Sequence, residues 1–229
     1  MDEKPITRTH LLRRAGALGG VLAAGGSLGA VRALAAPATA AAAFTLTPEQ
    51  EEGPFYVALE KMRKNITLGR PGVPLDLRIT VVDSRTAKPI VGAACDIWQC
   101  DATGVYSDES SQSTVGQTWL RGVQLTDAHG LAHFETIYPG FYQGRTTHIH
   151  VKVHIGGSVH GTAYRGGHVS HTGQLLFDDA TGTAVYAVAP YTNDTNQRTL
   201  NTQDHVYTQE HGSKSVLKLT KLGATAADG

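Results

Sequence analysis

The stretch "YQGRTTHIHVKVHI", residues 142–155, decides the fold because its polar and apolar residues alternate. In a β-strand, successive side chains point to opposite faces of the sheet. The apolar members of this pattern share one face: Ile149, Val151, Val153 and Ile155. The polar members share the other: His148, His150, Lys152 and His154. The apolar face predicts a core-facing strand, whereas the histidine face needs a functional explanation.

Two histidines on one strand face can serve a metal site. Residues i and i+2 lie roughly 6.5–7 Å apart along a strand, and two imidazoles can converge on one metal from there. His154 is about 13 Å from His150 by the same rise, which is too far for the same centre. A zinc hydrolase site would need a third His or a carboxylate and an open position. No Asp or Glu lies within residues 136–177, so a two-histidine, one-carboxylate iron site has no local support. At this point the metal and its chemistry stay open.

Short apolar runs separated by turn residues fill the rest of the chain. The runs are "LDLRITVVD" 75–83, "AACDIWQC" 93–100, "TWLRGVQLTD" 118–127, "LAHFETIY" 131–138, "GQLLFDD" 173–179, "TAVYAVAP" 183–190 and "KSVLKLTKL" 214–222. No amphipathic helix of useful length interrupts them. This spacing predicts an all-β fold, an antiparallel β-sandwich of roughly 7–9 strands with long loops at 102–117 and 156–172.

Residues 1–43 have the composition of an export signal. A basic start is followed by an Ala- and Gly-rich apolar middle and by small residues, and the pair Arg13 and Arg14 is typical of twin-arginine signals. An ordinary secretory signal and an uncleaved membrane anchor are the alternatives. We therefore expect a secreted or periplasmic protein without stable membrane association after cleavage, with residues 44–229 as its single domain.

Charge and cysteine content narrow the class of protein. Lys and Arg total 20 and Asp and Glu total 20, so no nucleic-acid partner is expected. Cys95 and Cys100 are five residues apart on a predicted strand and would point to opposite faces. A disulfide between them is not expected, and two buried free thiols are the simpler interpretation.

Several motifs, in order, resemble those of the intradiol ring-cleavage dioxygenases, non-haem iron(III) enzymes that open catechols between the two hydroxyl-bearing carbons. The segment "TIYPGFYQGRTTHIHVKV" (136–153) resembles their metal-binding segment. It follows "TPEQEEGPFY" (47–56), "GAACDIWQCDATGVYS" (92–107) and "LRGVQLTDAHGLAHFE" (120–135), and "HTGQLLF" (171–177) comes after it. The likeness covers about residues 47–178, and it is closest to the short, secreted branch of the family.

The resemblance implies a set of four metal ligands: Tyr106, Tyr142, His148 and His150. Phenolate is a hard anionic donor suited to Fe(III), and only a strongly acidic metal ionises a phenol of ordinary pKa about 10 at neutral pH. The resemblance also implies that Tyr142 acts as the base for a catechol proton. Tyr138 precedes the ligand position and is interpreted as structural.

Further roles follow from the same resemblance. Arg145 occupies the position of an arginine over the substrate ring, where it would stabilise developing charge. Gln174 occupies a glutamine position that contacts substrate or bound oxygen, and Phe55 a position in the pocket wall. Trp98 is interpreted as a core residue.

The resemblance thus implies an Fe(III) intradiol dioxygenase that converts catechol-type diols and O2 to cis,cis-muconate-type products, as a monomer or small homo-oligomer. Two alternatives from other classes remain. One is a secreted β-sandwich module that binds carbohydrate or protein and has lost catalysis. The other is a zinc hydrolase that uses the histidine pair.

Overall fold

The computed structural model describes residues 46–58 and 61–221. The export signal predicted for residues 1–43 lies outside the described residues. Within the described ranges, no helix combines the length and the apolar character needed to cross a membrane.

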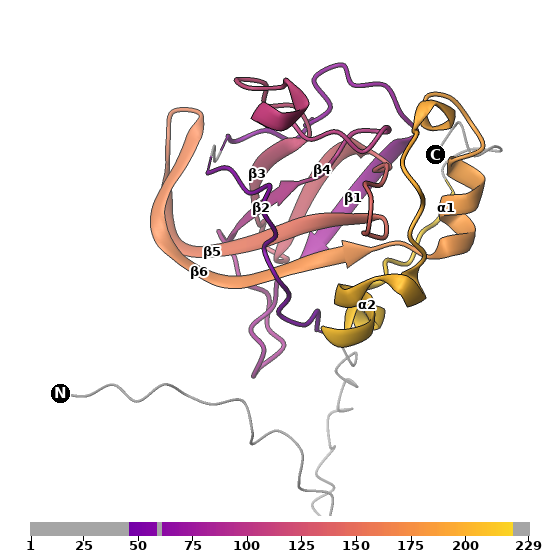
Figure 1. The fold of residues 1–229 in the computed structure, drawn as a ribbon. Helices are drawn as coiled ribbons and strands as arrows, with labels where there is room; N and C mark the ends of the chain where they lie inside the picture. Colours follow the sequence, from indigo (N-terminus) through magenta and orange to yellow (C-terminus); the bar gives the residue numbers. More distant parts are fainter. Residues whose placement is uncertain (1–45, 59–60, 222–229) are drawn as a thin grey trace, which may run out of the picture. The chain divides into compact units, whose positions relative to one another are not determined.

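Strands dominate the described part of the chain and form two antiparallel sheets (Figure 1). One sheet has the order β3-β2-β5-β6, and the other pairs β1 with β4. The strands are β1 Pro74–Thr80, β2 Ala94–Trp98, β3 Arg121–Leu125, β4 Leu131–Ile137, β5 His148–His160 and β6 Ala163–Leu176. The predicted antiparallel all-β class is confirmed, although these six strands are fewer than the roughly 7–9 expected.

The main core contains the apolar face of β5. Ile149, Val151 and Val153 are buried there together with Phe134 of β4 and Leu77 of β1. The predicted alternation along β5 is therefore confirmed. The polar face of β5 is buried as well, from His148 to His154, so a second layer of chain must cover it.

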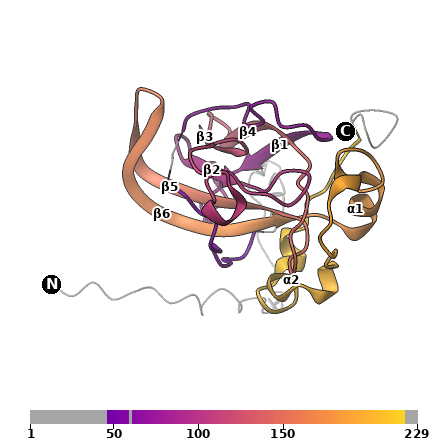
Figure 2. The same cartoon turned by 45° about the horizontal axis from the view of Figure 1, so that its top comes forward.

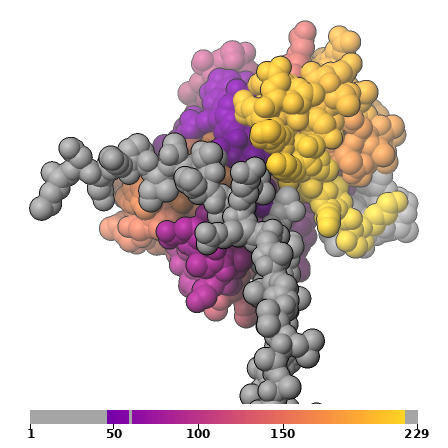
Figure 3. All heavy atoms as spheres, turned by 90° about the horizontal axis from the view of Figure 1, so that it is seen from below, coloured from indigo at the N-terminus to yellow at the C-terminus, as the bar shows by residue number. Residues whose placement is uncertain are grey.

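That covering layer comes from both ends of the described chain. The arm, defined as residues 46–58, runs beside β6, where Gln50 N donates to Thr172 O at 3.0 Å. The C-terminal segment, residues 200–217, reaches the end of the same strand, where Leu217 N donates to Leu176 O at 2.8 Å. Figure 3 shows the indigo arm in contact with the yellow C-terminal segment. Two pieces of chain far apart in sequence therefore meet over the polar face.

Strands β5 and β6 form a hairpin that extends beyond the sheet (Figures 1 and 2). A register shift lies between Val153 and His154, and beyond it most residues are exposed. The prediction of a loop at 156–172 is therefore wrong. The Gly-rich composition was misleading, because paired strands here accommodate glycines at positive φ: Gly156, Gly161, Gly166 and Gly167.

The predictions of strands at residues 183–190 and 214–222 are also wrong. Helix α1, Asp179–Val185, occupies the start of the run 183–190, because the Asp178 side chain accepts from Thr181 N at 2.8 Å and caps the helix. Among residues 214–221, which are the described part of the second run, only Val216 makes a bridge, to Leu176. The remaining helices are α2 His205–Gln209 and the short 3-10 helices η1 Ser110–Gln112, η2 Tyr191–Asn193, η3 Asn201–Gln203 and η4 Gly212–Ser215.

The two cysteines behave as predicted. Cys95 and Cys100 are both buried and both free.

Candidate metal centre and active site

The histidine pair lies at the start of β5 with both imidazoles buried. The two Nε2 atoms are 3.0 Å apart. His148 Nδ1 is 2.6 Å from the carbonyl oxygen of Thr146, which can only accept, so Nδ1 carries the proton. The lone pair of His148 is therefore on Nε2 and directed toward His150. This orientation is the one that a metal ligand requires.

Two tyrosines complete the cluster. Tyr142, in the connection between β4 and β5, has its Oη 3.4 Å from His148 Nε2. Tyr106, in the connection between β2 and β3, is 0% exposed, and its ring lies 5.7 Å from that of Tyr142 and 6.4 Å from that of His150. The structure thus brings together all four residues predicted as ligands.

The long connection after β2 holds Tyr106 in place through hydrogen bonds to its backbone. Tyr106 N donates to Gln112 Oε1 at 2.6 Å, and Tyr106 O accepts from Thr114 Oγ1 at 2.6 Å. The backbone of Tyr106 is therefore fixed by its own loop, and its side-chain hydroxyl takes no part in these hydrogen bonds. The region predicted as a long loop has the local order that a ligand needs.

Burial controls the protonation of the four residues. Burial, and then the charge of Arg145, lowers the pKa of His148 to about 3, and burial with the neighbouring His148 holds the pKa of His150 well below its usual range. Burial raises the pKa of Tyr142 to about 12 and that of Tyr106 well above its usual range. The cluster therefore presents neutral imidazoles and, without a cation, neutral phenols.

The donor set fits a ferric ion. The Tyr106 hydroxyl is buried and has no hydrogen-bond partner among the described residues, which is costly unless another group binds it. Two neutral nitrogen donors face two phenol oxygens, and the cluster contains no carboxylate. Two phenolates would balance most of the charge of a trivalent ion, whereas structural and hydrolytic zinc sites use Cys, His and carboxylate donors.

Arg145 lies beside this cluster and is 7% exposed. Its Nε donates to Asp204 Oδ2 at 2.8 Å, its Nη2 donates to Gln174 Oε1, and its Nη1 is 3.4 Å from Tyr142 Oη. Gln174 also donates through Nε2 to Glu51 O at 3.0 Å. Arg145 and Gln174 are therefore part of one network that ends at Tyr142.

Phe55, on the arm, covers the tyrosines. Its ring is stacked on Tyr106 at 4.3 Å with an interplanar angle of 18°, and it meets Tyr142 edge-on at 5.3 Å. The carbonyl of Phe55 accepts from Arg121 Nη1 at 2.7 Å, which fixes the arm at this point. Gly53 approaches closely too, because a Cβ there would lie 3.2 Å from His150 Cε1.

Two residues near the centre were not predicted as functional. Trp98, interpreted as core, is buried and stacks on His150 with centroids 4.7 Å apart. The register explains this contact, because Trp98 of β2 and Gln174 of β6 are both opposite His150. Asp204, in a polar stretch without a recognisable motif, contacts Arg145. No local sequence motif indicates either contact. The contact of Trp98 depends on the pairing of β2 with β5, and that of Asp204 depends on the packing of the C-terminal segment against Arg145.

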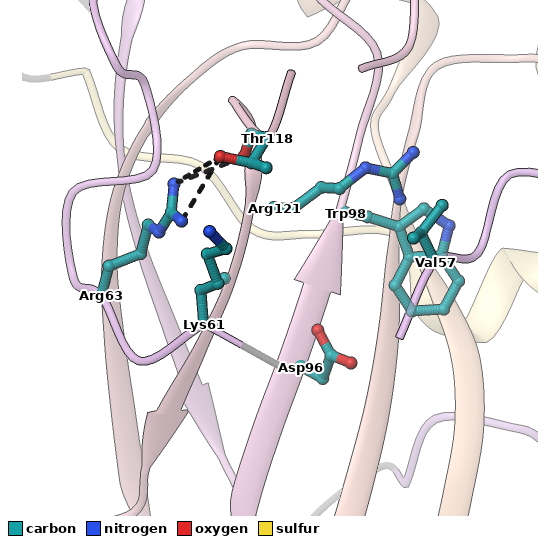
Figure 4. A pocket seen from close by; sticks show the side chains of 8 residues that line it. Val57, Lys61, Arg63, Asp96, Trp98, Thr118 and Arg121 are labelled. Atoms are coloured by element: carbon teal, nitrogen blue, oxygen red, sulfur yellow. Dashed lines mark hydrogen bonds between the residues drawn. The ribbon is translucent and has the colours of Figure 1, made fainter. Parts of the chain in front are cut away.

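A separate hollow is shown in Figure 4. It is lined by Val57, Lys61, Arg63, Asp96, Trp98, Thr118, Arg121 and Gly122. None of the four candidate ligands lines it, and Arg63 donates across one side to Thr118. Two of its lining residues contact the cluster, because Trp98 stacks on His150 and the Arg121 guanidinium lies 5.9 Å from the centre of the Tyr106 ring. We assign the hollow no part in the chemistry.

A family model and solved structures identify similar proteins. Residues 51–208 match a family model described as Dioxygenase. An intradiol ring-cleavage dioxygenase from Tetranychus urticae has a TM-score of 0.67 and 35% sequence identity, over 76% of this chain and 87% of that chain. The crystal structure of a further dioxygenase has a TM-score of 0.67 and 34% identity, over 76% and 86% of the two chains.

A curated relative gives a shorter match. A catechol 1,2-dioxygenase from Candida albicans is 32% identical over 95 residues, which are 39% of this chain and 31% of that protein. The match thus spans less than a third of the length of that relative.

Proposed function

Because the chain belongs to the intradiol ring-cleavage dioxygenase family, we propose that it opens catechol-type diols between their hydroxyl-bearing carbons with non-haem Fe(III). Both atoms of O2 would enter a cis,cis-muconate-type product, so no external reductant is required. The observation that supports this proposal is the convergence of two tyrosines and two histidines in one cluster without a carboxylate, in which Tyr106, His148 and His150 are buried and Tyr142 is partly buried.

Tyr106, Tyr142, His148 and His150 would hold the iron. When bound, the ferric ion supplies a strongly acidic centre that ionises phenol oxygens near neutral pH and takes both oxygens of a diol. The protein contributes a desolvated site, in which the imidazoles stay neutral and available as donors. His148 is oriented by Thr146 O, and His150 by the flat contact with Trp98.

Tyr142 is the proposed proton acceptor for one catechol hydroxyl. Burial raises the pKa of this phenol to about 12, so a phenolate at this position is a strong base. Its Oη is also within 3.4 Å of Arg145 Nη1, which would stabilise the phenolate until it takes up the proton. Tyr106 is 0% exposed, and its hydroxyl has no hydrogen-bond partner in the part of the chain that the structure describes, so it would remain a ligand.

Arg145 is the proposed electrostatic catalyst. A buried guanidinium next to the cluster would stabilise negative charge that develops on the substrate ring. Gln174 shares a hydrogen bond with Arg145, and its amide would contact substrate in place of the Glu51 carbonyl. Phe55 would form the wall against which the aromatic ring packs.

The proposal is tested with the purified full-length chain. Bound iron and a broad visible tyrosinate-to-iron absorption are expected, together with the uptake of one O2 for each catechol and an ultraviolet product band. A panel of substituted catechols would define the substrate. A colourless protein without iron after careful metal analysis would support a binding module, and bound zinc with hydrolysis would support the zinc hydrolase.

We also propose export to the cell exterior or periplasm, which rests on residues 1–43 of the sequence. Twin-arginine transport carries folded proteins, so iron could be loaded before export. Replacement of both Arg13 and Arg14 by Lys should retain the protein in the cytoplasm. Normal export of that variant would instead indicate an ordinary secretory signal.

A further inference from the structure

Asp204 combines complete burial with contacts to two separate segments. Its side chain is 0% exposed. One oxygen, Oδ1, accepts from Tyr207 N at 2.9 Å and caps α2. The other, Oδ2, accepts from Arg145 Nε at 2.8 Å and from Thr146 N at 2.9 Å. A single carboxylate therefore joins the C-terminal segment to the residue beside the metal cluster.

These contacts determine the direction of the guanidinium. The five N–H groups of arginine lie in one rigid plane, so hydrogen bonds that fix two of its nitrogens also fix the direction of the third. Asp204 holds Nε and Gln174 holds Nη2, and Nη1 is consequently directed at Tyr142 Oη. Without Asp204 the fork could turn about its long side chain.

The buried guanidinium also needs a buried counter-charge. The only other carboxylate within 4 Å of Arg145 in the described ranges is that of Glu51, at 3.6 Å from Nη1. Glu51 is 41% exposed and pairs with His205 at 2.9 Å, so it is a weak substitute. Burial by itself would raise the pKa of Asp204, but the charge of Arg145 and hydrogen bonds from Tyr207 and Thr146 hold it below its usual range.

A second contact of the same segment supports this arrangement. Thr146 Oγ1 donates to Asn201 Oδ1 at 2.6 Å, next to the bond from Thr146 N to Asp204. Residues 201–204 thus form hydrogen bonds with both the backbone and the side chain of Thr146, which follows Arg145. Such support on both sides is what keeps a functional group within its productive geometry.

We propose that Asp204 is a positioning residue for the ring-opening reaction, acting through Arg145 by holding its guanidinium toward Tyr142. This inference rests on the proposed function of the site. The hydrogen bonds of Asp204 are to Arg145, Thr146 and Tyr207 and not to a candidate ligand, so its loss should affect turnover and leave iron binding intact.

The test compares Asp204→Ser, Arg145→Ala and the double variant in the iron-loaded full chain. Serine keeps a side-chain oxygen for the α2 cap and removes the carboxylate from Arg145. Asp204→Ser should lower kcat for catechol about 10- to 100-fold with the visible band retained and KM little changed. In the Arg145→Ala background it should have no further effect on kcat, because the two residues act as one unit. An equal loss in both backgrounds would overturn the proposal.

The matched control is Asp178→Ser. Asp178 caps α1 in the same way and has no contact with Arg145, so kcat should be unchanged. If Asp204→Ser does not fold, the nearly isosteric Asp204→Asn takes its place with the same expectations. Wild-type kcat in every Asp204 variant that retains iron would also overturn the proposal.

A readout independent of turnover separates this inference from the proposed function. In the iron-free, 15N-labelled full chain, the Arg145 Nε–H should exchange slowly with water, and it should exchange fast in Asp204→Ser but not in Asp178→Ser. If wild-type protein opens no catechol, the proposed function fails while this signal still decides whether Asp204 holds Arg145. Equal exchange rates in wild type and Asp204→Ser would refute the positioning role.

Discussion

The indole of Trp98 lies flat against the imidazole of His150, with ring centroids 4.7 Å apart and an interplanar angle of 2°. His150 Nδ1 has no hydrogen-bond partner among the described residues. Ligand histidines are usually oriented by a hydrogen bond from the second ring nitrogen. At His150 the orientation therefore depends on stacking, on strand register and on the close approach of Gly53.

The first prediction concerns this contact. Trp98→Ala should lower the free energy of unfolding by about 3–5 kcal/mol and also weaken iron binding, because His150 loses its support. Phe134→Ala, in the main core, should lower stability by a similar amount without changing the visible band of the folded protein. Chemical denaturation and absorbance of iron-loaded samples measure the two effects. Equal iron affinity in the two variants would contradict the role of the stack.

A second prediction separates the ligand tyrosine from a structural one. Tyr106→Phe should lower iron affinity by more than the roughly 10- to 100-fold that the loss of an outer-shell partner causes, and it should alter the visible band. Tyr138→Phe is the matched control, because the Tyr138 hydroxyl is also buried without a hydrogen-bond partner in residues 46–58 and 61–221 but lies in the main core. Iron titration of both variants gives the result. A Tyr106→Phe protein with the wild-type spectrum would exclude Tyr106 as a ligand.

Substitution of Arg145 should separate catalysis from metal binding. Arg145→Ala should retain iron and the visible band while kcat falls roughly 100- to 1000-fold, as for the loss of a charge-stabilising donor. Arg145→Lys should recover little, because an ammonium cannot reproduce the three directed contacts. Arg198→Ala, which removes a partly exposed arginine that pairs with Asp179 of α1, serves as the control. Unchanged turnover in Arg145→Ala would remove Arg145 from the mechanism.

The histidine pair also predicts a pH dependence of the iron-free protein. The pKa of His148 is lowered from 6.5 to about 3 by burial and by Arg145, so the unfolded state takes up a proton that the folded state excludes. The contribution of neutral His148 to the free energy of unfolding is complete above a pH of about 6.5. It is lost as the pH falls toward 3, by about 1.4 kcal/mol per pH unit. His148→Gln should therefore show a shallower decline of unfolding free energy between these values. Parallel curves for the two proteins would show that His148 is not excluded from protonation.

The sequence and the structure agree where the information is local. Alternation along residues 148–155 predicted which face of β5 joins the core, because strand periodicity depends only on neighbours. Composition was misleading at 156–172, where glycines occupy turns and bulges of a paired hairpin. The composition of the apolar run from Thr183 to Pro190 favours a strand, but the cap supplied by Asp178 starts a helix that extends into this run.

In the candidate site, the ligand residues could be predicted from the sequence, but two contacts that support them could not. The motif order placed Tyr106, Tyr142, His148 and His150 in one predicted set, and the structure brings their side chains together. The contacts of Asp204 and Trp98 could not be derived in this way. Asp204 reaches Arg145 across 59 residues, and Trp98 meets His150 only when β2 and β5 pair in one register.

The return of the C-terminal segment to Arg145 has a consequence for the order of folding. Residues 51, 174 and 204 all contact Arg145, so the guanidinium is not fully held until nearly the whole described chain has been synthesised. Contacts of such sequence separation form late and slow the folding of β-rich proteins. A nascent chain that already contains both histidines and both tyrosines therefore has its four metal donors before Arg145 is oriented. Competence for metal binding would then precede competence for turnover during biosynthesis.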